Sequence, residues 1–135
     1  MHDVMREFTI SCDADKAWSV FSDFAGFLNW AGSGDIRIEG EGIGMIRHLN
    51  MGVGEIAERL DKKDDDTRTL AYSLVYGEPL GMKVYRAEVR LTSSGDGSTT
   101  LHWHGSFETT GDVNAADVNS NLAAAFEGMS HAQGC

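Results

Sequence analysis

The stretch NAADVNSNLAAAFEGMSH, residues 114–131, has the pattern of one long amphipathic helix. Asp112 or Asn114 is suited to cap its start, because Asp and Asn side chains accept hydrogen bonds from the first free backbone N–H groups. At about 1.5 Å per residue the helix spans roughly 27 Å, which is long enough to cross a small domain. Its large apolar side chains recur every three or four residues: Val118, Leu122, Phe126 and Met129.

Almost everything before this helix alternates apolar and polar residues, as strands with one dry face do. Short turns separate neighbouring strands, which favours an antiparallel meander. The order predicts an α+β domain: a seven-stranded antiparallel sheet, two short helices between its first and second strands, and the long C-terminal helix on its dry face. The expected strands are residues 4–12, 35–39, 44–49, 55–62, 68–76, 83–91 and 99–108, and the short helices lie within 13–24 and around 24–28.

Composition limits the classes of partner. The 135 residues fit one domain, residues 1–135, and the formal net charge of -10 argues against nucleic acid and anionic membrane surfaces. No apolar run is long enough for a membrane span or a signal peptide, so a cytoplasmic location is expected. The two cysteines, Cys12 and Cys135, give no disulfide framework. The sequence leaves a homodimer open.

Four segments together resemble one known family. They are DADKAWSVFSDFAGFLNW, EGEGIGMIRHL, GEIAERLDKKDD and LAYSLVYGEPLGMKVYRAEVRL. In order and spacing they are similar to the polyketide cyclase/dehydrase-like branch of the START (SRPBCC) superfamily, which includes the birch-pollen allergen. The resemblance covers nearly the whole chain. It implies a helix-grip fold, in which the sheet wraps around the C-terminal helix and a cavity for lipids, polyketides or other apolar molecules lies between them.

Arg47 and Glu58 are the most informative polar pair. Arg47 shares a strand face with apolar residues 45 and 49, and Glu58 shares one with residues 56 and 60. A hairpin turn at residues 51–54 would place the two side chains opposite each other on the inner face. A buried charge needs a partner, and this arrangement supplies one. The pair is either a polar handle for a ligand or a structural ion pair at the sheet margin.

The inward-facing aromatic residues either line the walls of a cavity or form part of the hydrophobic core. Tyr76 is expected on the inner face with the other strand aromatics, and residues 123–125, three alanines, would leave room along the helix. The helix would then form one wall of the cavity. The complete set of expected ligand-binding residues is Trp30, Arg47, Glu58, Tyr72, Tyr85, Trp103, Phe107, Leu122, Phe126 and Met129.

Other motifs indicate no cofactor or metal. His102 and His104 share a strand face, but it is the wet face, and a zinc site needs further ligands. The acidic run of residues 61–66 lacks the glycine and glutamate of a calcium loop. The glycines of residues 40–44 do not have dinucleotide-binding spacing and precede a strand. Cys12 has no evident activating neighbour, and no catalytic residue is identified.

These observations favour a protein that binds or carries a small apolar molecule in an internal cavity. The alternative is a cyclase, aromatase or dehydratase in which Arg47 stabilises an oxyanion and Glu58 or a cavity tyrosine transfers a proton. A carboxylate paired with arginine stays ionised, which suits a weak base better than an acid. The resemblance also implies that residues 50–54 and 77–81 are loops that gate the pocket, because they match by position the loops that close over the hormone in the abscisic-acid receptors of the same superfamily.

Overall fold

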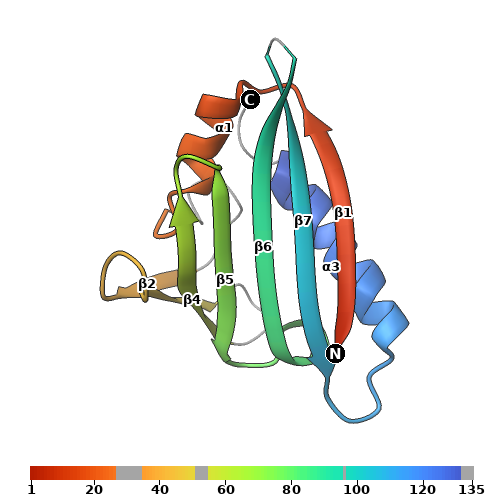
Figure 1. Ribbon diagram of the computed structural model, residues 1–135. Coiled ribbons are helices and arrows are strands. Elements are labelled where there is room, and N and C mark those ends of the chain that lie inside the picture. Colours follow the sequence, from red (N-terminus) through yellow and green to blue (C-terminus); the bar gives the residue numbers. More distant parts are fainter. Residues whose placement is uncertain (27–34, 51–54, 96, 132–135) are drawn as a thin grey trace.

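The computed structural model describes residues 1–26, 35–50, 55–95 and 97–131. One short helix precedes β2 in this part of the chain; residues 24–26 form a bend and turn, and the rest of the second short helix expected around residues 24–28 lies outside it. The elements, labelled as in Figure 1, are β1 (His2–Ile10), α1 (Ala14–Phe21), β2 (Asp35–Glu39), β3 (Ile46–Asn50), β4 (Glu55–Asp64), β5 (Thr69–Tyr76), the 3-10 turn η1 (Pro79–Gly81), β6 (Met82–Gly95), β7 (Ser98–Thr109) and α3 (Ala115–His131).

The seven strands form one antiparallel sheet in the order β1-β7-β6-β5-β4-β3-β2. Strands β2 to β7 follow one another as the expected meander, and β1 pairs with β7, the last strand. The long strands β6 and β7 pair over most of their length, whereas β2 and β3 are short and lie at the opposite side (Figure 1). The α+β fold and the seven-stranded sheet predicted from the sequence are confirmed.

Helix α3 packs behind β1 and β7 (Figure 1). Asn114 caps it, because its side-chain oxygen accepts a hydrogen bond from the Ala116 N–H at 2.8 Å. Gly105 of β7 permits the close approach: a Cβ there would lie 3.1 Å from the Phe126 and 3.2 Å from the Leu122 side chain. Asn119 also donates a hydrogen bond to the Asp3 carbonyl at 3.1 Å, so the helix is tied to the edge strand β1.

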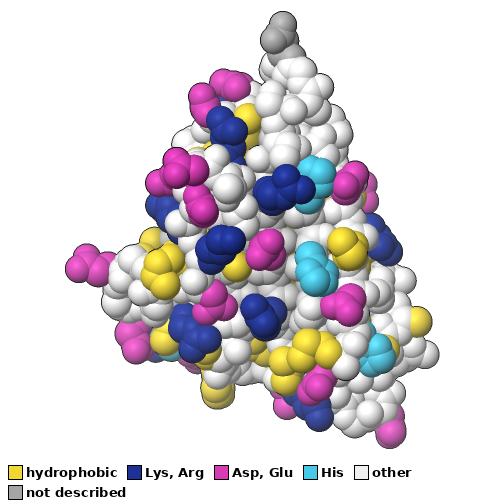
Figure 2. Space-filling view, in the orientation of Figure 1, with side chains coloured by type: hydrophobic (Ala, Val, Ile, Leu, Met, Phe, Trp, Pro, Cys, Tyr) yellow, Lys and Arg dark blue, Asp and Glu magenta, His cyan; other side chains and the backbone are white. Residues whose placement is uncertain are grey.

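The outer face of the sheet carries charges of both signs interspersed with histidines (Figure 2). On this face Asp3 accepts hydrogen bonds from His104 and Ser106. Glu7 pairs with His102 at 2.9 Å. Strand alternation therefore gives the expected wet face and a dry face toward the helix.

Two local features differ from the sequence expectation. Tyr76 is 62 % exposed, because a bulge in β5 pairs Glu58 with Leu74 but Ala57 with Tyr76. The extra residue, Val75, turns Tyr76 to the outer face, so its placement on the inner face was wrong. Cys12 is disulfide-bonded, although the two cysteines of the sequence indicated no disulfide framework.

Candidate functional site

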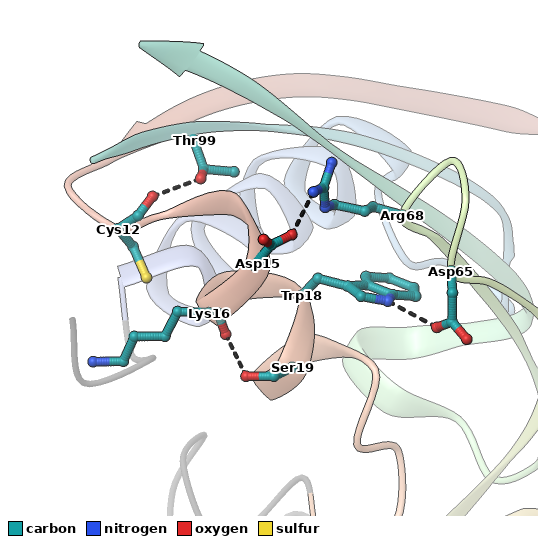
Figure 3. Close-up of polar contacts among 8 residues, drawn as sticks. All are labelled: Cys12, Asp15, Lys16, Trp18, Ser19, Asp65, Arg68 and Thr99. Carbon is teal, nitrogen blue, oxygen red and sulfur yellow. Dashed lines mark hydrogen bonds and ion pairs between the residues drawn. The ribbon is translucent and has the colours of Figure 1, made fainter. Parts of the chain in front are cut away.

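Helix α1 is fixed against the hairpin between β4 and β5 by polar contacts (Figure 3). The Trp18 indole donates a hydrogen bond to Asp65 at 2.9 Å, and Arg68 pairs with Asp15. Just before α1, the Thr99 hydroxyl of β7 donates to the Cys12 carbonyl at 2.6 Å. These contacts hold the end of α1, and with it the turn that follows.

That turn forms one wall of a pocket of about 400 Å³. The Phe24 side chain is buried, and Met45 and Leu60 lie opposite it on the inner face. The Leu60 N–H donates to the Met45 carbonyl at 2.8 Å, so these two residues face each other across neighbouring strands. The pocket is lined by Ser22, Asp23, Phe24, Ala25, Gly42, Ile43, Met45, Leu60 and Lys63.

Arg47 and Glu58 lie next to this pocket and form a buried ion pair. They are direct cross-strand partners in β3 and β4, as predicted. Arg47 Nε and Nη2 lie 3.0 Å and 2.9 Å from the same carboxylate oxygen, Glu58 Oε1. The side chains are only 5 % and 7 % exposed. Two charges thus face the dry side of the sheet, where desolvation is costly and pairing is required.

Phe24 connects the ion pair to the pocket. Its carbonyl accepts a hydrogen bond from Arg47 Nη1 at 3.3 Å, and its ring centroid lies 3.9 Å from Arg47 Cζ. The ring therefore stabilises the guanidinium by a cation–π contact, and Phe24 also lines the pocket. The sequence analysis missed Phe24 as a site residue. Its apolar character gave no signal, since the contact depends on how α1 and the following turn are placed.

Two tyrosines complete a polar corner beside the ion pair. Tyr72 of β5 and Tyr85 of β6 are both buried, and their rings contact each other edge to face with centroids 6.1 Å apart. Burial raises the pKa of both hydroxyls, and the nearby Glu58 charge raises the pKa further. Both tyrosines therefore stay neutral at ordinary pH. We call Arg47, Glu58, Tyr72 and Tyr85 the polar corner.

The other expected site residues divide into two groups. Trp103 and Phe126 stack with centroids 4.4 Å apart and an interplanar angle of 10°, and the Trp103 indole donates a hydrogen bond to Ser130 at 2.8 Å. Together with Leu122 and Phe107, they belong to the buried core between α3 and the sheet, and Phe107 is the cross-strand partner of Tyr85 in the polar corner. Trp30 and the Met129 side chain lie outside the described residues.

The three helix alanines are not equivalent. Ala123 is half-buried and packs against the core, whereas Ala124 and Ala125 are exposed. Ala125 is seven residues after Val118 and therefore on nearly the same side of the helix, yet Val118 is buried. Ala125 thus lies at the exposed edge of a helix face whose centre, Leu122 and Phe126, is buried.

The loop of residues 77–81 is tied to its neighbours on both sides. Gly77, at φ 97°, sits so close to β4 that a Cβ would lie 2.7 Å from the Glu55 carbonyl. The Gly81 carbonyl accepts a hydrogen bond from the Thr110 N–H at 3.0 Å. The other loop expected to gate the pocket, residues 50–54, lies almost entirely outside the described residues.

Neither a metal cluster nor a membrane span is found in residues 1–26, 35–50, 55–95 and 97–131. His102 and His104 lie on the outer face, as predicted, and each pairs with a carboxylate of β1. No helix among these residues has both the length and the apolar content to cross a bilayer. The histidine pair is thereby explained by cross-strand contacts.

Comparisons with known proteins agree with this architecture. A family model described as polyketide cyclase / dehydrase and lipid transport matches residues 1–133. The major strawberry allergen Fra a 1.04 of Fragaria ananassa is 32% identical over 83 residues, which cover 56% of this chain and 52% of the allergen. The chain thus spans about half the length of this relative.

Two solved structures have the same fold. The protein XoxI from Bacillus cereus superposes with a TM-score of 0.84 at 19% identity, covering 98% of this chain and 93% of the other. Norcoclaurine synthase from Thalictrum flavum gives a TM-score of 0.72 at 20% identity, covering 96% and 84%. At these identities the similarity shows the fold.

Proposed function

The chain belongs to the polyketide cyclase / dehydrase and lipid transport family, whose members bind hydrophobic ligands, and from this we propose that it binds or carries a small apolar molecule beside the polar corner. A lipid, a polyketide or an aromatic metabolite fits this description. The ligand would lie on the inner face of the sheet, with apolar contacts from Phe24, Met45 and Leu60 and polar contacts from the corner.

One observation carries the proposal: charged and hydroxyl groups are buried together in an otherwise apolar interior, beside a pocket. The Arg47 and Glu58 side chains are 5 % and 7 % exposed, and the pocket next to them has a volume of about 400 Å³. Small-ligand sites combine mainly apolar walls with a few converging polar groups. A core without a ligand would be more stable with apolar residues at these positions, since burying an ion pair costs desolvation energy.

Native mass spectrometry of the purified protein tests this proposal. We expect an added mass corresponding to a small apolar molecule, which dissociates on collisional activation. Arg47→Leu should reduce the bound fraction, and Arg37→Leu is the matched control, because the Arg37 side chain is 65% exposed on β2. A protein that carries no added mass and binds none of a panel of naphthalene derivatives would contradict the proposal.

A second candidate is an enzyme of the cyclase or dehydratase kind, and one observation favours it. Two neutral tyrosine hydroxyls lie beside a carboxylate, an arrangement that can deliver and accept protons. Norcoclaurine synthase, solved in complex with dopamine and hydroxybenzaldehyde, provides an enzyme with this fold. Against it, Arg47 is already held by Glu58 and Phe24, which leaves less of its charge for an oxyanion. Turnover of a polyketide-like substrate that Tyr72→Phe abolishes would favour the enzyme.

A further inference from the structure

Among the residues that the structure describes, none donates a hydrogen bond to the second carboxylate oxygen of Glu58. Both Arg47 contacts go to Oε1, and no other hydrogen bond reaches Glu58 from the part of the chain that the structure describes. The side chain is nevertheless 93% removed from solvent, at 7% exposure. Buried carboxylate oxygens are hydrogen-bonded in nearly all proteins, because an unsatisfied one costs free energy. Oε2 is therefore an acceptor that lacks a donor.

Arg47, by contrast, is engaged on several sides. Its Nε and Nη2 face Glu58, its Nη1 donates to the Phe24 carbonyl, and its planar face covers the Phe24 ring. An incoming carboxylate would have to displace one of these contacts and approach the Glu58 charge. Two like charges in a buried site repel strongly. The corner therefore disfavours an anionic ligand.

The tyrosines add one donor. Two hydroxyls hold two protons, and a hydrogen bond between the neighbouring Tyr72 and Tyr85 would use only one of them. The other proton has no partner among the described residues. The corner thus offers an unused acceptor, Glu58 Oε2, and an unused hydroxyl donor. A group that donates and accepts at once satisfies both, and the hydroxyl is the smallest such group.

We infer that the polar corner recognises the hydroxyl group of an apolar alcohol or phenol, which donates to Glu58 Oε2 and accepts from a tyrosine hydroxyl. The inference rests on the proposed function and specifies its ligand class. A ketone or an ether lacks the proton that Glu58 requires, and a carboxylate meets the Glu58 charge. A buried acceptor left without its donor discriminates strongly against such analogues.

Three probes of the same shape test this on the unmodified protein: 2-naphthol, 2-methoxynaphthalene and 2-naphthoate. We expect 2-naphthol to bind about tenfold or more tightly than either of the others, by NMR titration or calorimetry, since a hydrogen bond to a charged group is involved. Equal affinities, or a preference for the ether or the acid, would overturn the inference while leaving the proposed function standing. If none of the three binds, the inference fails, and the proposed function fails with it if native mass spectrometry also finds no bound small molecule.

The Glu58→Gln variant tests directly whether Glu58 determines the preference among the three probes. Without the carboxylate, Arg47 needs an anion, so the order should reverse and 2-naphthoate should bind more tightly than 2-naphthol. Glu55→Gln is the matched control: it lies on the same strand with a 56% exposed side chain and should keep the wild-type order. If Glu58→Gln does not fold, Arg47→Leu/Glu58→Leu removes both charges, and all three probes should then bind within about threefold of one another. Selectivity that survives in either variant would contradict the assignment to Glu58.

Discussion

The inner face of the sheet has two halves that are built differently. Beneath α3, on β1 and β7, the contacts are apolar and close: Trp103 stacks on Phe126 at 4.4 Å, and Gly105 leaves no room for a side chain. On β3 to β6, beyond the helix, the same face carries the polar corner. There a charge pair, two hydroxyls and a neighbouring pocket replace dense apolar packing.

The two halves of the sheet therefore have different roles: one mainly stabilises the fold, and the other is suited to binding. The half under α3 gains free energy from each buried side chain and has its one buried indole N–H satisfied by Ser130. The polar corner gives up stability, because burying charges costs more than their attraction returns unless every polar atom is paired. Polar groups kept in this way at a cost to stability indicate a binding role.

The largest effect on stability is expected in the half of the inner face that lies under α3. Phe126→Ala removes a fully buried ring that contacts Trp103 and the backbone at Gly105. We expect a loss of about 4 kcal/mol in the free energy of unfolding, measured by urea denaturation, from lost transfer energy and the cavity left behind. The wild-type preference among the naphthalene probes should persist in the folded fraction. A loss below about 1 kcal/mol would show that this half is not the main source of stability.

In the polar corner, loss of a charge should be reversible by a second mutation. Arg47→Leu leaves Glu58 buried without its partner, and we expect a loss of about 3 kcal/mol, near the lower end of the range for such pairs because Glu58 can take up a proton. The double variant Arg47→Leu/Glu58→Leu should recover most of it. The same urea experiment measures both. An additive, larger loss in the double variant would mean that the pair stabilises the fold.

A glycine pair tests how tightly α3 approaches the sheet. In Gly105→Ala the new Cβ would lie 3.1 Å from the Phe126 and Val4 side chains, so we expect a loss of about 1 to 2 kcal/mol from overpacking. Gly128→Ala is the control: it lies in α3, and its Cβ would meet no atom within 4 Å. Because alanine is the better helix former, this variant should gain up to about 1 kcal/mol. Thermal unfolding of both variants measures the contrast.

Tyrosine titration compares the polar corner with the outer face. Of the three tyrosines, Tyr76 is exposed, while burial raises the pKa of Tyr72 and Tyr85. Absorbance at the phenolate band should therefore show that Tyr72 and Tyr85 ionise only well above the ordinary pH range for tyrosine, or on unfolding. The pKa of Tyr72 and Tyr85 is higher in the folded than in the unfolded state, so the folded protein holds their protons more tightly. The stability that depends on these neutral hydroxyls is therefore complete below about pH 10 and is lost as the pH rises further. Ionisation of Tyr72 and Tyr85 in the folded protein at the ordinary pKa of tyrosine would contradict the burial of the corner.

The sequence predicts the fold well because alternation and helical spacing directly report which side of each element is dry. The pairing of Arg47 with Glu58 follows from that alternation and is confirmed in the structure. Tyr76 was misplaced because a single extra residue, Val75, reverses the alternation, and no sequence feature marks a bulge there. Phe24 was missed because its role depends on the position of a turn relative to a distant strand.

The division of the inner face was likewise not predictable. Trp103, Phe107, Leu122 and Phe126 were expected beside the ligand along with Arg47 and Glu58, because all are inward-facing. Whether an inward side chain packs against the helix or faces a pocket depends on where α3 crosses the sheet. That position is set by a missing side chain, at Gly105, which alternation alone does not reveal.

The smallest effect on stability, and the finest test of the boundary between the halves, is expected at two adjacent alanines of α3. Ala124 and Ala125 are both exposed, so replacing either with Trp should change the free energy of unfolding by no more than about 0.5 kcal/mol. Ala125 shares its side of the helix with Val118, whereas Ala124 points about 100° further from the sheet.

Ala125→Trp should therefore weaken 2-naphthol binding if the ligand reaches α3, because the indole would extend from the exposed edge of the inner helix face. Ala124→Trp should leave the affinity unchanged. The comparison needs only the two dissociation constants and the two unfolding curves, and it locates the helix wall of the pocket to within one residue. Equal affinities in the two variants would place the ligand wholly on β3 to β6, with Phe24 rather than α3 as its cover.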